Sequence, residues 1–263
     1  MRRIHKATVR DRLVHHALFR VLYPLFDRTF IHDSYSCRVG KGTHRAVQRL
    51  EVFSRKISLN GRRNFWTLKC DVRRFFDSVD HHTLSSLIRR QVHDGGALWL
   101  VERILASFHT APGSGLPLGN VTSQLFANIY LNELDRFVKH DLGCRYYLRY
   151  CDDFLILSRN FSELGLCRDW IAGFLSSSLG LALHSDKVRI RKYSQGIDFL
   201  GYVVRPHHTV LRTRTKRRML ARISAHNALS YFGMLKHCDS HKLECILEAA
   251  LRQRSRRMLA QSA

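Results

Sequence analysis

The sequence predicts an α+β fold in which helices pack on one side of a sheet. Three observations support this: a β-prone aromatic run at 64–71, a strand–turn–strand pattern at 145–157, and apolar residues at helical spacing around them. The order strand, helices, hairpin, helix, strand is the ferredoxin-like pattern. With 263 residues, 45% of them hydrophobic, the chain is long enough to bury a sizeable core.

Helices are expected before and after the first strand. Residues 10–30 carry apolar side chains at helical spacing, and a basic, glycine-containing loop follows, with Thr43 placed to N-cap the next helix. Residues 64–71 are typical of a strand that ends at Asp71. The next helix should begin near Ser78 or Asp80 and stop before Gly95 and Gly96.

The second half of the chain continues the pattern. A Gly/Pro loop at 111–119 precedes a helix that ends near Gly143, and the hairpin at 145–157 has Cys151, Asp152 and Asp153 at its tip. A further helix should stop at Gly180, and short strands are expected in KVRIRKY and IDFLGYVV. Residues 205–263 should be helical and carry 13 Lys or Arg against 3 Asp or Glu, a net charge of +10.

The charge balance limits the function classes. Lys and Arg number 44 against 21 Asp and Glu, a formal net charge of +23. An enzyme for small neutral metabolites does not need such a field, whereas a polyanion such as nucleic acid explains it better than a membrane surface does. No apolar run is long enough to cross a bilayer and the first residues contain no apolar signal region, so no membrane partner is expected.

Cysteine and histidine usage points to a reducing compartment. The seven cysteines form no CxxC pair, which makes a disulfide framework or a zinc ribbon improbable. The sixteen histidines lack the spacing of zinc ligands and are expected to be structural or on the surface. A cytoplasmic location is the expectation.

Three carboxylates are expected to converge on one edge of the sheet. Asp71 ends one strand, and Asp152 and Asp153 form the tip of the hairpin. Like charges at such distances repel unless cations neutralise them, and Mg²⁺ prefers carboxylate oxygen ligands shared with substrate phosphates. Two such ions can activate a hydroxyl and hold a leaving pyrophosphate. The alternative is that the Asp pair is only a turn, since Asp is common in turns.

Five motifs in order resemble those of reverse transcriptases, across roughly residues 64–204. DVRRFF, which starts at Asp71, resembles the first catalytic motif of that family, and LPLGNVTSQ resembles the motif of its nucleotide pocket. YCDD resembles the YxDD box, Lys187 stands where the family has a lysine, and FLGY resembles the primer grip. The resemblance implies a right-hand polymerase with a ferredoxin-like palm, partial fingers and a small helical thumb.

Within that superfamily the sequence is most similar to the reverse transcriptases of diversity-generating retroelements. GKGTH, LPLGNVTSQLFANIYLNELD and RYCDDFLIL carry this resemblance. Group II intron and retroviral enzymes usually have Gln before the pocket glycine, where this chain has Leu118. In the retroelement family an aliphatic residue there accompanies error-prone copying of template adenines, which fits the loss of a polar contact. The alternative is that Leu118 only packs.

The resemblance implies roles for individual residues. Asp71, Asp152 and Asp153 would hold two Mg²⁺ ions, or Mn²⁺ in their place, with the Val72 carbonyl as a further ligand. Lys187 would be the acid for the pyrophosphate leaving group, with a solvated surface lysine as the alternative.

The nucleotide-binding roles follow in the same way. Phe76 would be the steric gate that excludes a 2′-hydroxyl, with Phe75 in the core. Gly119, next to Leu118, would let the protein backbone approach the incoming nucleotide because it has no Cβ. Arg10 and Arg12 would contact the triphosphate. Template phosphate would lie against Arg38 and Lys41.

The resemblance also implies domains and partners. The expected domains are fingers at 1–63, N-terminally incomplete relative to the family, a palm at 64–204 with inserted helices at about 80–115, and a basic thumb at 205–263. Expected partners are an RNA template, a DNA or RNA primer strand, dNTPs, a small basic accessory protein and a structured RNA. Two alternatives stay open: a group II intron-like or defence reverse transcriptase, and an inactive, truncated nucleic-acid-binding remnant.

Overall fold

The computed structural model describes residues 7–224 and 226–261, with side chains described as far as Arg252. These residues form two compact units. The first comprises the described residues up to Ala46 together with Trp66–Ile190, and the second comprises Val47–Phe65 and the described residues from Arg191 onward. The predicted division into fingers, palm and thumb is a division by function and stays a prediction.

A four-stranded sheet is the framework of the first unit. Its order is β2 (Tyr147–Tyr150), β3 (Asp153–Ser158), β1 (Trp66–Asp71) and β4 (Arg189–Lys192). β3 is antiparallel to both β2 and β1. Because β3 is an inner strand, its four central residues, Phe154 to Leu157, are all buried. The predicted strand and hairpin are thereby confirmed.

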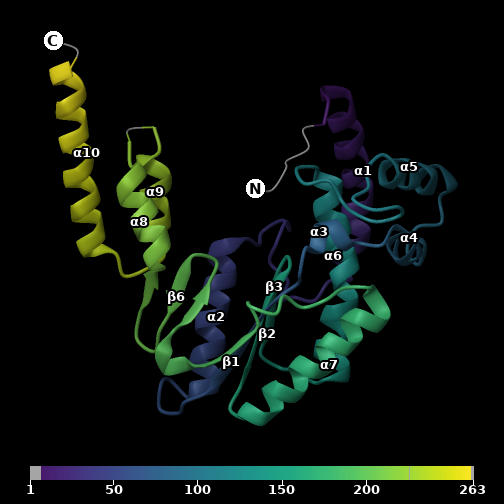
Figure 1. Cartoon of the computed structure of the whole chain (residues 1–263), viewed down its shortest axis with the longest axis horizontal. Helices are drawn as coiled ribbons and strands as arrows, with labels where there is room; N and C mark the ends of the chain where they lie inside the picture. Colours follow the sequence, from purple (N-terminus) through teal and green to yellow (C-terminus); the bar gives the residue numbers. More distant parts are fainter. Residues whose placement is uncertain (1–6, 225, 262–263) are drawn as a thin grey trace. The chain divides into compact units, whose positions relative to one another are not determined.

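Two long helices pack against this sheet. α7 (Phe161–Leu179) contacts β1 and β3, and α6 (Val121–Arg136) contacts α7 and reaches β2 through Asp135 (Figure 1). α6 is buried along almost its whole length because α1 (Val9–Asp27) and α4 (His81–Arg89) also pack on it. α7 ends at Gly180 in the left-handed conformation, as predicted.

Two short helices complete the first unit beside α4. α3 (Phe75–Ser78) follows β1 directly, and the side chain of Asp80 caps α4 by accepting from the Thr83 amide. α5 (Gly95–Ala106) then packs on α4. Gly95 and Gly96 thus begin a helix rather than only ending the preceding one.

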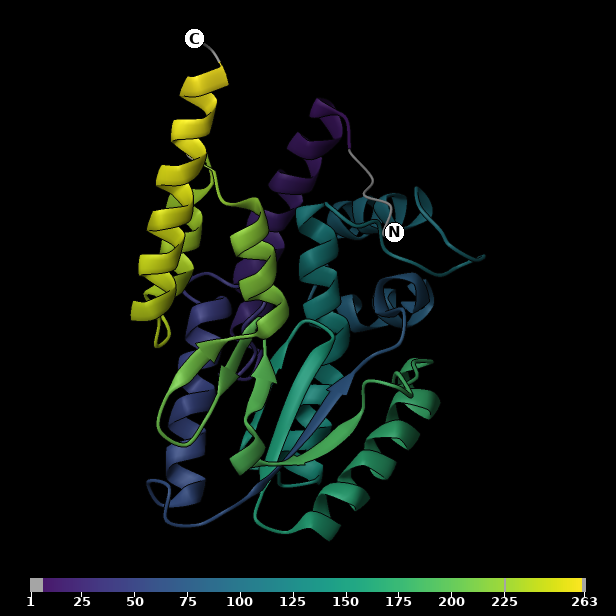
Figure 2. The same ribbon diagram turned by 60° about the vertical axis from the view of Figure 1, so that its left-hand side comes forward.

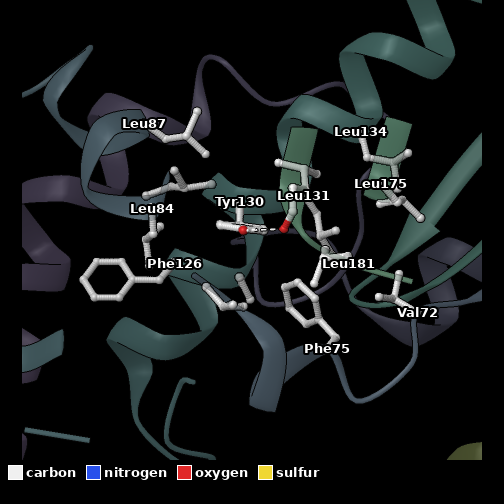
Figure 3. Packing of buried hydrophobic residues seen from close by; sticks show 14 of the residues in the cluster. Val72, Phe75, Leu84, Leu87, Phe126, Tyr130, Leu131, Leu134, Leu175 and Leu181 are labelled. Carbon is white, nitrogen blue, oxygen red and sulfur yellow. Dashed lines mark hydrogen bonds between the residues drawn. The ribbon is translucent and has the colours of Figure 1, made fainter. Parts of the chain in front are cut away.

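The core of the first unit is built around the α6 helix. Phe75 and Tyr130 lie in it among leucines of α4, α6 and α7 (Figure 3). The Tyr130 hydroxyl donates to the carbonyl of Leu179 at 2.7 Å, so the polar end of a fully buried ring is satisfied. Phe75 is itself buried in this cluster, which confirms the expectation that it is a core residue.

The second unit is a small sheet followed by helices. Its antiparallel strands have the order β5 (Ile197–Phe199), β6 (Tyr202–Val204) and β7 (Thr209–Leu211). β5 and β6 are joined by a turn at Leu200 and Gly201, both at positive φ. IDFLGYVV is therefore a hairpin, and the residues from 205 onward are not wholly helical because β7 lies among them.

Three helices follow β7, and α2 (Thr43–Ser58) belongs to this unit over most of its length. They are α8 (Thr213–Arg222), α9 (Ala228–Leu235) and α10 (His241–Gln261), and α10 lies beside α9 (Figure 2). Among the described residues, no helix combines the length and the apolar character needed to cross a membrane.

Two predicted helix ends differ in detail. Thr43 is the first residue of α2 rather than its cap, and its hydroxyl donates to the Tyr150 hydroxyl at 3.3 Å. α6 ends at Arg136 and continues as a π-helical turn, η1 (Phe137–Asp141), before Gly143 at φ +63°. The first difference accompanies a contact between distant segments and the second a change of helix type, and neither is visible in local periodicity.

A pair of glycine substitutions tests this description. Gly115 has φ +111° and a Cβ there would lie 2.7 Å from the Thr110 hydroxyl, whereas Gly173 is in the middle of α7 with open space around it. Gly115→Ala should lower the free energy of unfolding by about 1–3 kcal/mol. Gly173→Ala should raise it by about 0.5–1 kcal/mol. Urea unfolding followed by circular dichroism measures both, and equal effects would contradict the assigned backbone.

Candidate active site

The register of β1 and β3 brings the predicted carboxylates together. Asp71, the last residue of β1, is paired with Asp153, the first residue of β3. The Val72 amide donates to the carbonyl of Asp152 at 3.1 Å, which holds the chain after β1 against the hairpin turn. The convergence expected from the sequence is present in the structure.

The turn between β2 and β3 is as short as a hairpin allows. Tyr150 pairs with Asp153, so Cys151 and Asp152 alone form the loop. Cys151 has φ +54°, a conformation that two-residue hairpins usually give to glycine. A non-glycine residue is strained there, and such strain is typical of functional sites.

Two lysines neutralise the carboxylates. Lys187 places Nζ 2.8 Å from Asp71 Oδ1, and Lys69 places Nζ 3.2 Å from Asp153 Oδ2. Lys187 reaches Asp71 because the His184 amide donates to the Asp71 carbonyl and the Lys187 amide donates to that of His184. The prediction that Lys187 belongs to this site therefore agrees with its position, although its role stays a prediction.

Lys69 is a site residue that the sequence reasoning missed. It lies two residues before Asp71 on β1, so both side chains point to the same face of the sheet. The alternation of side chains along the strand was therefore the sequence signal that could have identified Lys69 as a neighbour of Asp71.

Burial changes the ionisation of one carboxyl group. Burial raises the pKa of Asp153 to about 6, the ammonium of Lys69 opposes the rise, and the charges of Asp71 and Asp152 add to it. Its Oδ1 is buried and accepts no hydrogen bond. The orphaned oxygen can accept one further partner, and burial is the main cause of the raised pKa.

The donor set suits a hard divalent cation. Among the described side chains no group of three or more His, Cys, Asp or Glu is already arranged as a metal cage. Asp71 and Asp152 lie on neighbouring chain segments, and Asp153, which has an orphaned oxygen, is paired with Asp71 across the strands. Oxygen donors, shared carboxylates and room for substrate phosphates are the conditions that Mg²⁺ favours.

The predicted nucleotide-pocket residues lie on α3 and on the Gly/Pro loop that follows α5. The Leu116 amide donates to the carbonyl of Phe76 at 2.7 Å, so the Gly/Pro loop is fastened to the predicted gate residue. Phe76 is half-buried, with its ring packed edge-on against Phe75 at 5.3 Å. Leu118 is half-buried and Gly119 is exposed at φ +117°.

A cavity of about 420 Å³ lies next to the same loop. Residues of α1 line it together with residues of α5 and of the loop, including Asp11, His15, Arg103, Pro117 and Asn120. His15 Nδ1 lies 2.7 Å from the Thr122 hydroxyl, a buried contact that ties α1 to the start of α6.

The arginines of α1 lie outside this cavity. Arg10 and Arg12 are exposed on α1 and are not among the lining residues. Their predicted contact with the triphosphate stays a prediction.

Arg38 is used within the protein. Its side chain is 7% exposed, and it donates to the carboxylate of Asp27 at 2.7 Å and to the carbonyls of Ile31 and Ser34. Lys41 donates to the His32 carbonyl at 2.9 Å and lies over the Tyr35 ring. These bonds shape the basic loop, and for Arg38 they argue against the expected contact with template phosphate.

The raised pKa of Asp153 predicts a pH-dependent stability without metal. Between about pH 4, near the value for an unfolded Asp, and about pH 6 the folded state binds this proton more tightly. The contribution of Asp153 therefore favours the fold at low pH and is lost as the pH rises through 6.

In EDTA, the stability of Asp153→Asn relative to the parent should increase by about 2 kcal/mol from pH 4 to pH 8. Urea unfolding across this range measures it. Asp77→Asn removes a charge at an exposed position and controls for net charge. A flat difference between the Asp153 variant and its parent would contradict the assigned burial.

Comparison with known proteins identifies the family. The family model described as Reverse transcriptase (RNA-dependent DNA polymerase) matches residues 1–204. Protein YkfC of Escherichia coli is 26% identical over 250 residues, covering 79% of this chain and 62% of YkfC. The group II intron-encoded protein LtrA of Lactococcus lactis subsp. cremoris is 25% identical over 292 residues, covering 84% of this chain and 47% of LtrA. The chain thus spans about half to two thirds of these relatives.

Solved structures agree at the level of the fold. Telomerase from Candida albicans, solved with a fragment of telomeric RNA, superposes with a TM-score of 0.63 at 13% identity and covers 94% of this chain and 47% of its own. Apo telomerase from Candida tropicalis gives a TM-score of 0.59, covering 86% of this chain and 44% of its own. The right-hand polymerase fold expected from the motifs is therefore confirmed. With the family match over most of its length, the chain belongs to the reverse transcriptase (RNA-dependent DNA polymerase) family.

Proposed function

We propose that this protein synthesises DNA on an RNA template by nucleotidyl transfer. The observation that carries the proposal is the juxtaposition of Asp71, Asp152 and Asp153 at one end of β1 and β3, in a chain of this family. Asp71 comes from one motif, and Asp152 and Asp153 come from another that is distant in the sequence. A simple acidic turn would not bring Asp71 to the hairpin. This makes the turn-only alternative for the Asp pair the weaker one.

The carboxylates would hold Mg²⁺. Asp71 and Asp152, with the Val72 carbonyl and with Asp153 beside them, would bind two ions, which when bound lower the barrier to attack by a primer 3′-hydroxyl and stabilise the charge on the leaving group. The hydroxyl loses its proton to solvent, and its oxygen forms a bond to the α-phosphorus as the bond to pyrophosphate breaks. The Lys187 ammonium, 2.8 Å from Asp71, would give a proton to the departing pyrophosphate.

The neighbouring loop would select and seat the nucleotide. Phe76 presents a half-buried ring beside the loop that carries Leu118 and Gly119, and a ring there would exclude a 2′-hydroxyl. Gly119 has no Cβ to obstruct the nucleotide. Arg10 and Arg12 are exposed on α1 and would contact a triphosphate that extends to this helix.

The basic helix α8 would contact the nucleic-acid backbone. It buries Thr215 and Met219, one turn apart, and leaves five basic residues exposed. These are Arg214, Lys216, Arg217, Arg218 and Arg222. Such contacts bind phosphate without regard to sequence and weaken with salt. Template RNA, a primer strand and dNTPs are the proposed partners.

The finer role that we propose is error-prone copying of a template RNA in a diversity-generating retroelement. The apolar side chain of Leu118 beside the pocket glycine supports it, because this residue cannot offer the hydrogen bond that Gln would. A small basic accessory protein and a structured RNA would then assist. A group II intron-like role is the second candidate, favoured by the similarity to LtrA.

Primer extension on an RNA template with Mg²⁺ and four dNTPs tests the activity. Asp71→Asn and Asp152→Asn should each lower the rate at least about 1,000-fold, because several kcal/mol of charge stabilisation are lost. Primer–template affinity should be unchanged or tighter, since a negative charge has been removed. Asp77→Asn is the matched control and should extend normally.

The inactive-remnant alternative gives a different pattern. Parent and variants would then bind primer–template equally and extend nothing. That outcome would refute the polymerase proposal.

Sequencing the products tests the retroelement role. The parent should misincorporate mainly opposite template adenines, and Leu118→Gln should lower that error about tenfold because a polar contact to the nucleotide is restored. Leu118→Met keeps an apolar side chain and should keep the parent's errors. Faithful copying by the parent would instead support the group II intron-like role.

A further inference from the structure

A fully buried charged cluster lies behind the turn that carries Asp152. The side chains of Arg149 on β2 and Asp135 on α6 are both 0% exposed. Arg149 donates from Nε to Asp135 Oδ1 at 2.7 Å and from Nη2 to Oδ2 at 2.6 Å, which is a two-pronged guanidinium–carboxylate pair. Tyr147 donates its hydroxyl to the same Oδ1 at 2.6 Å.

Stability of the fold does not by itself explain this cluster. Removing two charges from water costs several kcal/mol for each ion, and apolar residues of similar volume often stabilise such a position as well or better. The pair therefore indicates that a particular local conformation is being held. The remaining donor nitrogen of Arg149 shows which part of the backbone it holds.

The third nitrogen of Arg149 reaches the active-site turn. Nη1 donates to the carbonyl of Cys151 at 3.1 Å, and the Asn128 side-chain oxygen lies 3.3 Å from the same nitrogen. Cys151 is the residue at φ +54° that directly precedes Asp152. The buried guanidinium thus fixes the peptide unit that joins Cys151 to Asp152. The orientation of this unit determines the direction in which Asp152 points.

The strand that carries Arg149 is itself held at its outer edge. The Arg149 amide donates to the Asp33 carbonyl and the Tyr35 amide donates to the Arg149 carbonyl, both at 2.9 Å. Asn128 donates its side-chain amide to the Ser36 carbonyl at 2.9 Å. Backbone and side chain of Arg149 are consequently fixed from both sides, so the guanidinium cannot follow the turn if the turn relaxes.

We infer that Arg149, held by Asp135, is a positioning residue that keeps the strained Cys151 turn in the conformation from which Asp152 binds metal. This inference rests on the proposed function, because it assigns a purpose to Asp152. The residue touches neither substrate nor metal and acts through the carbonyl of Cys151. Loss of the contact should leave a folded protein whose metal affinity is weakened.

The test measures metal binding by the free, full-length protein. Mn²⁺ titrations followed by electron paramagnetic resonance give the affinity, with the Asp71→Asn/Asp152→Asn double variant as the baseline without a site. Arg149→Lys keeps the charge and loses the planar fork. We expect its Mn²⁺ affinity to fall about 10- to 100-fold, the effect typical of groups that orient a metal ligand. Primer–template affinity should change less than about twofold, because the phosphate-contacting surface is untouched.

Tyr147→Phe is the matched control. It removes a buried hydrogen bond from the same Asp135 and leaves the two bonds of Arg149 to Asp135 and its bond to Cys151. We expect a lower unfolding midpoint with the parent's Mn²⁺ affinity. Equal losses of affinity in the two variants would mean that the cluster only supports the fold, and would overturn the inference.

Asn128→Ala tests the same contact more gently if Arg149→Lys does not fold. It removes one acceptor from Nη1, and Mn²⁺ affinity should fall in the same direction by a smaller factor. Unchanged affinity in this variant, or a parent that binds no more Mn²⁺ than the double variant, would also overturn the inference. A parent that binds Mn²⁺ as expected but extends no primer would remove the polymerase proposal and leave the positioning role supported.

Discussion

The chemistry of this protein depends on holding like charges close together away from water. Pairing Asp71 with Asp153 across two strands and placing Asp152 in the adjoining turn raises the electrostatic energy of the folded state, as the orphaned, partly desolvated Asp153 shows. The surrounding structure offsets this cost with fixed cations. Lys69 and Lys187 pair directly with two of the carboxylates, and Arg149 holds the backbone beside the third. Each cation is anchored on a different segment, so the acidic cluster is supported from several directions at once.

Local patterns in the sequence were sufficient for the elements that position the site. Aromatic and aliphatic runs predicted β1 and the β2–β3 hairpin. A helix start was predicted near Ser78 or Asp80 and a helix end at Gly180, and the structure has Asp80 as the cap of α4 and Gly180 as that of α7. The convergence of Asp71 with the hairpin acids could be predicted because it needs only that two recognised strands be neighbours. The motif order in the sequence also predicted the family that the comparison then showed.

Interactions between distant segments were beyond the reach of such patterns. Arg38 looked like a phosphate contact because the loop around it is basic, and only the fold shows that Asp27 and two carbonyls use its donors. In the sequence, Arg149 and Asp135 are charged residues with nothing to distinguish them from surface residues of a strand and a helix. Their complete burial follows from how α6 packs on β2. The three-residue strand β7 has too few residues for a period of two to stand out, and pairing with β6 alone makes it a strand.

The two-residue loop between β2 and β3 also limits how this chain can change in length. One residue added there, or within β1, would move a carboxylate to the opposite face or out of register, because side chains alternate along a strand. The link between α4 and α5, which is exposed at His93 and Asp94, is outside the sheet and bears no such restriction. Natural insertions, reporter peptides and affinity tags are therefore compatible with that link and not with the hairpin, and a comparison of related genes should show length variation concentrated accordingly.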